Sequence, residues 1–204
     1  MASVPAGFRP VKHLNGSPFN GQVNRYMISA SDAQATNVGD FVQLSDNDAL
    51  VETSTGFGVY PAVERIGSGT AVPIIGVIVG FEPDFANLNT SGNYRAASTK
   101  RIALVADASD LIFACPQDAD GGVVAAASVG LNVAVILGTA GTSGAYNSGM
   151  SVDSSSVATT ATLPLQLMGV TAAPDNDVTS TSRPAELLVR VNTHAYNAAG
   201  LAGV

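Results

Sequence analysis

The sequence predicts a mainly β protein, a β-barrel or β-sandwich body with an extended N-terminal arm. Short runs rich in Val, Ile and Leu alternate with clusters of Gly, Asn, Asp and Ser over most of the chain, which is typical of an all-β domain. Residues 129–137, 163–167 and 187–191 carry apolar side chains at every second position, the period of a half-buried strand. A helical period is nowhere strong, and only the Ala-rich residues 31–36 and 119–128 would suit short helical turns.

Residues 1–28 are expected to form the arm. Prolines at positions 5, 10 and 18, with glycines between them, leave no regular period, because proline fixes the backbone and lacks an amide donor. A disordered tail would rarely keep large apolar side chains, yet four remain in this segment: Phe8, Leu14, Phe19 and Tyr26. We therefore expect these anchors to be buried, either on the protein's own body or on a neighbouring subunit.

The charge of the arm is opposite to that of the body. Arg9, Lys12 and Arg25 are its only charged residues, whereas all acidic residues lie between Asp32 and Glu186. A basic segment on an acidic chain favours docking on an acidic partner surface. These three cations and the four apolar anchors are the candidate contact residues.

The body, residues 29–204, is expected to be one β-rich unit, and a division into two sub-lobes would fall near residues 90–100. Strands are predicted at residues 41–44, 58–63, 73–81, 101–106 and 110–115. The last two are expected to pair with each other around the turn that joins them.

Later residues follow the alternating segments named above. Pro164, Arg190 and Asn192 are expected to face away from the core, because they fall between the apolar positions. Two long turn-rich stretches, residues 138–156 and 172–184, are interpreted as loops that either make contacts or cover the surface.

Composition excludes several classes of function. The net charge of −7 argues against a nucleic-acid groove, which needs basic residues to neutralise phosphates. No apolar run reaches the length of a membrane helix, and no signal peptide is readable at the N-terminus. Charged residues make up only 12% of the chain, about half the usual share, which suits a surface that packs against other proteins.

The sequence shows no residue pattern suited to catalysis or to a cofactor. His13, His194 and the single cysteine, Cys115, lack metal-ligand spacing, so Cys115 is expected to be a buried structural residue. No metal is expected either. Paired acidic residues are best explained by turn formation, and they stand at Asp46 and Asp48, Asp118 and Asp120, and Asp175 and Asp177.

The whole pattern resembles the head decoration, or cement, proteins of tailed bacteriophages. The resemblance spans most of the chain and rests on three stretches: the Pro- and Gly-rich residues 4–11, the strand at 39–44 that leads to residues 73–79, and residues 101–113 with the Gly/Ser/Thr-rich loop beyond them. It implies a protein made in the host cytoplasm that binds the outer surface of the virion head. Its arm or the edges of its body would clamp neighbouring capsid subunits. Its partners would be the major capsid protein and other copies of itself, either in a homo-oligomer or as neighbours on the shell.

Two further interpretations of the function remain open. A carbohydrate-binding or adhesin-type β-sandwich would bind sugars through surface aromatic residues, but the chain has no Trp and few aromatics. Another virion part, such as a tail or capsid shell protein, would share the contact-making surface, although shell proteins are normally longer. A non-enzymatic structural protein is the prediction.

Overall fold

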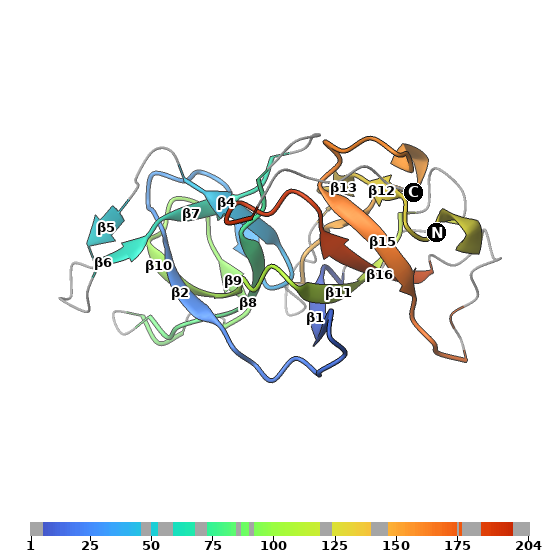
Figure 1. Cartoon of the computed structure of the whole chain (residues 1–204). Coiled ribbons are helices and arrows are strands. Elements are labelled where there is room, and N and C mark those ends of the chain that lie inside the picture. The colour runs from blue at the N-terminus through green and yellow to red at the C-terminus, as the bar shows by residue number, and fades with distance from the viewer. Residues whose placement is uncertain are drawn as a thin grey trace.

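The computed structural model describes residues 6–45, 50–52, 59–67, 73–84, 87–89, 92–118, 124–139, 147–174, 176 and 185–197. Within these residues the protein is mainly β, which confirms the predicted fold class. Most strands belong to two antiparallel five-stranded sheets. Figure 1 shows the two sheets side by side: the sheet described first below lies to the right, and the other lies to the left.

The first sheet has the strand order β1-β11-β16-β15-β12. Its strands are β1 (Arg9–His13), β11 (Leu111–Pro116), β16 (Glu186–Val191), β15 (Leu165–Val170) and β12 (Asn132–Val133). The alternating apolar residues of β16 face the core, as the sequence predicts. Every neighbouring pair is antiparallel, which allows one face to pack on a core while the other meets solvent.

The second sheet has the strand order β2-β10-β8-β4-β7. Its strands are β2 (Asn24–Ile28), β10 (Arg101–Ala106), β8 (Gly76–Phe81), β4 (Phe41–Leu44) and β7 (Val63–Arg65). A bridge between Met27 of β2 and Ala62, just before β7, brings the two edges of this sheet together. The sheet therefore curls around its own small core, which reduces the exposed edge that could pair with other chains.

Three short strand pairs and two single-turn helices complete the described residues. The pairs join β3 (Thr36–Asn37) to β9 (Tyr94–Arg95), β5 (Leu50–Glu52) to β6 (Val59–Pro61), and β13 (Val135–Ile136) to β14 (Ser151–Val152). The 3₁₀ turns are η1 (Ala126–Ser128) and η2 (Ser154–Ser156). The predicted strands at 41–44, 73–81 and 101–106 correspond to β4, β8 and β10, and 58–63 covers β6 and the start of β7.

One large apolar cluster joins the two sheets. Phe41 of the second sheet lies between Phe8 and Phe113, with ring centroids 4.2 Å and 5.4 Å away. All three rings are almost fully buried. Residues of both sheets share this cluster, and the chain passes from one sheet to the other at residues 14–23 and again at residues 107–110. The expected division of the body near residues 90–100 stays a prediction.

The N-terminal segment differs from the predicted arm. Its described residues, 6–28, supply an edge strand to each sheet, and Phe8 and Tyr26 are buried in the two cores. The prolines do not prevent this, because Pro10 stands in an edge strand, where a missing amide donor is tolerated. Pro18 turns back beside Lys12 and covers the outer edge of β1.

A close backbone contact fixes the start of this segment. Gly7 has a φ of +63°, and a Cβ there would lie 2.5 Å from the Cβ of Ser148. The amide of Phe8 donates to the carbonyl oxygen of Gly39 at 3.0 Å. Only glycine combines this backbone conformation with so close an approach, so residues 6–8 belong to the body.

Two predictions about strands are wrong, one about a pairing and one about the length of a strand. The strands at 101–106 and 110–115, β10 and β11, do not pair with each other, because β10 already lies between β2 and β8 while β11 lies between β1 and β16. The predicted strand at 129–137 is broken into β12 and β13, which belong to different sheets. Gly130, with a φ of +94°, turns the chain before β12 and leaves Val129 exposed.

The end of β16 also differs from the prediction. Pro164 and Asn192 are buried rather than outward. The reason is that the chain before β15 folds over Asn192, whose side-chain amide donates to the carbonyl oxygens of Ala161 and Leu163. The interpretation of 138–156 as a loop is incomplete, since β14 and η2 lie within it.

The other predictions on short segments have mixed outcomes. Residues 31–36 form no helix and end in β3, while the described part of 119–128 contains the single turn η1. Most of the stretch 172–184 lies outside the described residues, as do Asp46, Asp48, Asp120, Asp175 and Asp177.

Candidate functional site

The residues whose side chains are best suited to catalysis or metal binding make contacts within the body. Cys115 is fully buried, and burial raises the pKa of its thiol well above the usual range. His13 lies 3.0 Å from a carboxylate oxygen of Asp110. Asp118 accepts hydrogen bonds from the backbone and hydroxyl of Ser154. Among the described residues, no group of three or more His, Cys, Asp or Glu side chains could hold a metal ion.

His194 connects the C-terminal side of the body to the joint between the sheets. The amide of Tyr196 donates to Nδ1 at 3.2 Å, so the proton of the neutral ring is on Nε2, which donates to the carbonyl oxygen of Asp107 at 3.0 Å. The carboxylate of Asp107 in turn accepts hydrogen bonds from Asn24 and from the Tyr26 hydroxyl, the latter at 2.7 Å. This network ties β2 to residues 107 and 194 and is structural.

Two arginines serve the fold as well. Arg95 is completely buried and donates to four backbone carbonyl oxygens and to the Asp32 carboxylate. Arg65 places its Nε 3.5 Å from the buried carboxylate of Asp40, and burial raises the pKa of Asp40. A buried charge needs such partners, so Arg95 is not available for a ligand at the surface.

The candidate contact residues of the predicted arm do not form one surface. Phe8 and Tyr26 are in the cores, and Phe19 is partly buried against the larger one. Leu14 remains 48% exposed. Arg25 lies on the second sheet, where it pairs with Glu82.

Arg9 and Lys12 lie together on the first sheet. Both are opposite outward-facing residues of β11, Arg9 opposite Ala114 and Lys12 opposite Ile112. Arg190 of β16 flanks Ile112 from the other side. We call this surface, formed by Arg9, Lys12 and Arg190 around Ile112, the basic face. Figure 1 shows its three strands, β1, β11 and β16, next to one another.

The sequence predicts part of the basic face. Arg190 occupies an outward position in an alternating strand, and the structure confirms that orientation. What the sequence does not show is that β1 and β16 both pair with β11. Those two pairings join residues 9 and 12 to residue 190, and no local pattern encodes contacts over such separations.

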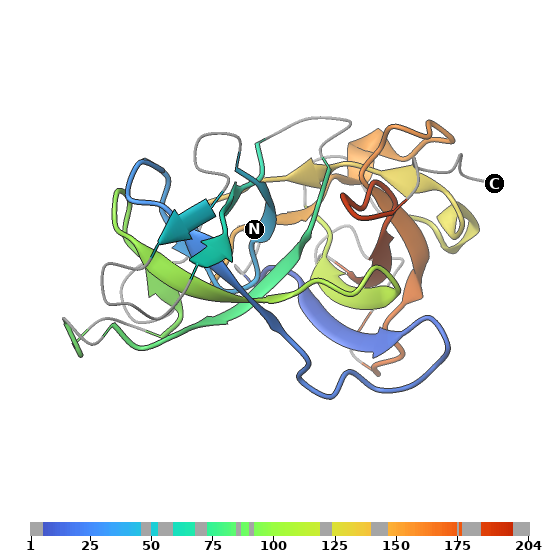
Figure 2. The ribbon, with the colours of Figure 1, turned by 60° about the vertical axis from the view of Figure 1, so that its left-hand side comes forward.

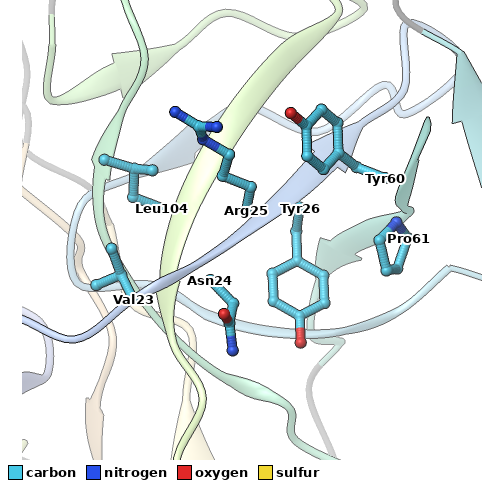
Figure 3. Close-up of a pocket in the computed structure, with 7 residues that line it drawn as sticks. All are labelled: Val23, Asn24, Arg25, Tyr26, Tyr60, Pro61 and Leu104. Carbon is cyan, nitrogen blue, oxygen red and sulfur yellow. The ribbon is translucent and has the colours of Figure 1, made fainter. Parts of the chain in front are cut away.

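A shallow groove of about 680 Å³ lies on the second sheet, beside β2. Its lining residues are Val23, Asn24, Arg25, Tyr26, Tyr60, Pro61 and Leu104. Figure 3 shows Arg25 beside Tyr60, with the Tyr26 ring pointing to the other side of the strand. Glu82 and, to a smaller extent, Tyr60 raise the pKa of Arg25, so its charge is already compensated within the protein.

Comparisons with protein-family models, with curated proteins and with solved structures find no match to this chain. In the described part of the chain no helix has the length and apolar character to cross a membrane. The described residues offer two surface features to a ligand or partner, the basic face and the groove.

Proposed function

We propose that this chain is a non-enzymatic structural protein of a tailed-phage virion. It binds the outer surface of the assembled capsid and stabilises it by bridging neighbouring capsid subunits. The observation that carries the proposal is the use of reactive and charged side chains inside the fold, as at Cys115, His194 and Arg95. Under this proposal the body acts through its contact surfaces.

The capsid as partner comes from the sequence resemblance to decoration proteins, and the fold is compatible with it. Residues of both sheets pack into one of the two apolar clusters, and a body joined in this way could hold two neighbouring subunits together. Stabilisation would follow from mass action, because a protein that binds only the assembled shell lowers the free energy of that state. Many identical contacts over one shell then add up.

The test is co-sedimentation with shells of the major capsid protein encoded in the same genome. We expect the chain to sediment with assembled shells, not with unassembled capsid subunits, and to raise the temperature at which the shells open. Purified capsid subunits are the control for binding outside the assembled state. A genome without a capsid gene, or shells that melt at the same temperature with the chain present, would contradict the proposal.

The groove beside β2 is the feature that favours the carbohydrate-binding alternative. Tyr60 borders it and is partly exposed, and tyrosine rings can stack on sugars. Under this alternative Tyr60→Ala would abolish binding to a glycan panel. Under the capsid proposal the wild type binds no glycan, and Tyr60→Ala binds shells as the wild type does.

A further inference from the structure

The basic face is organised by cross-strand register. Lys12, Ile112 and Arg190 stand directly opposite one another on three adjacent strands. Directly opposed residues of antiparallel strands point to the same side of the sheet. The neighbouring residues Leu111 and Val189 belong to the core cluster, so Lys12 and Arg190 point to the solvent side.

The basic face includes the next set of opposed outward residues along the three strands. Arg9 lies opposite Ala114, which lies opposite Leu188 of β16. The Arg9 side chain is 61% exposed and pairs with Glu186, the single acidic side chain on this side of the three strands. The basic face therefore carries three cations and one carboxylate, in a chain whose net charge is −7.

Lys12 and Arg190 lack a counter-charge in the described part of the chain. No described residue forms an ion pair with either of them; the Arg190 Nε donates to the neutral side chain of Gln166 at 2.8 Å. Their strands are two spacings apart, roughly 10 Å, close to the screening length of about 8 Å at physiological ionic strength. Two like charges at this separation do not stabilise the sheet.

The floor between the cations is apolar and already packed. Ile112 is 5% exposed and Ala114 is 3% exposed, although both are on the solvent side of the sheet. Flanking Lys and Arg side chains cover such residues with their aliphatic stems while their charged ends stay in water. The result is a sheet surface that presents cations around an apolar base.

From this arrangement we infer that the basic face is the surface that docks on an acidic region of the capsid subunit. The inference rests on the proposed function and adds which side of the protein faces the shell. Charge complementarity supports this choice: the chain as a whole is acidic, so an acidic partner is repelled by the rest of the molecule and attracted here. The groove beside β2 offers no such argument, because Arg25 pairs with Glu82.

The test is the binding of full-length protein to shells of the capsid protein from the same genome. The double variant Lys12→Glu with Arg190→Glu reverses the sign of two of the three cationic charges of the basic face. Two controls accompany it. Lys12→Arg with Arg190→Lys keeps both charges in place, and Arg25→Glu with Lys100→Glu makes the same change of net charge in or beside the second sheet. Circular dichroism and thermal melting verify that each variant is folded.

We expect the reversed face to weaken shell binding by about tenfold or more, while both controls bind within about twofold of the wild type. Binding of the wild type should also weaken as salt is raised. If the wild type binds but the reversed variant binds equally well, the inference is overturned and the proposed function stands. If the second-sheet control loses binding as strongly as the reversed face, general charge repulsion acts instead and the inference is overturned. If the wild type does not bind shells at all, the proposed function itself is wrong and the inference is overturned with it.

Discussion

Arg95 is the residue whose loss we expect to cost the fold most. Its guanidinium donates to the carbonyl oxygens of Ser29, Asp32, Gln34 and Thr99, and its side chain is completely buried. A single side chain thus closes the end of the second sheet, which is why an arginine rather than an apolar residue stands there.

We therefore predict that Arg95→Met destabilises the protein by about 3–5 kcal/mol, because four carbonyl oxygens and the Asp32 carboxylate lose their partner in a buried site. Chemical denaturation measures the change. Arg95→Lys should recover only part of the loss, since one ammonium group cannot reach all these acceptors. A change below about 1 kcal/mol for Arg95→Met would show that water replaces the guanidinium without difficulty.

The second prediction at this scale concerns pH. Burial lowers the pKa of His194 below its usual value of 6.5, so the folded state keeps the ring neutral while the unfolded state takes up a proton. The contribution of His194 to stability is therefore present above about pH 6.5 and decreases as the pH falls below it. Protonation would also place a proton on Nδ1, which then could no longer accept the hydrogen bond from the amide of Tyr196.

Denaturation curves recorded between about pH 8 and pH 5 test this directly. The wild type should lose stability toward acid, and His194→Gln should show a shallower dependence over the same range. Equal slopes for the two proteins would mean that His194 does not titrate differently in the folded and unfolded states.

At the scale of elements, the N-terminal segment shows how sequence and structure differ. Its prolines and glycines indicate an arm, but β1 and β2 each complete one sheet, and Phe8 fills the cluster between them. Burying a phenylalanine contributes about 1.5–3 kcal/mol, which only tertiary contact can provide. The bridge between Lys12 and Pro18 then closes the outer edge of β1.

We predict that deleting residues 1–28 unfolds the protein or lowers its melting temperature by more than about 10 °C. Deleting residues 1–5 is the matched control and should leave the melting temperature nearly unchanged, because the contacts of Gly7 and Phe8 remain. Thermal melting followed by circular dichroism gives both values. A truncated body that melts like the full chain would restore the view of residues 1–28 as a separate arm.

For the whole molecule, the shared cluster decides how the protein unfolds. Residues of both sheets pack into it, and Phe41 and Phe113 are in direct contact across the joint. We therefore predict one cooperative transition, with equal calorimetric and van't Hoff enthalpies. Scanning calorimetry would contradict the prediction by resolving two separate transitions, one for each sheet.

Local sequence patterns are enough to predict that this protein is mainly β, where several strands lie, and that Cys115 is buried. These features follow from local periodicity and side-chain chemistry, which act over a few residues. The sequence also identifies Arg9, Lys12 and Arg190 as outward or accessible cations, but not as neighbours.

The pairing of the strands, in contrast, is visible only in the folded protein. The tertiary structure places β10 and β11 in different sheets, divides residues 129–137 between two strands, and joins β1 to β11 beside β16. Pairings across about 70 to 105 residues depend on which edges are already occupied and on how the cores fit together, and neither is written in a local pattern. The basic face exists for that reason: its cations are adjacent because the sheet brings three distant segments together.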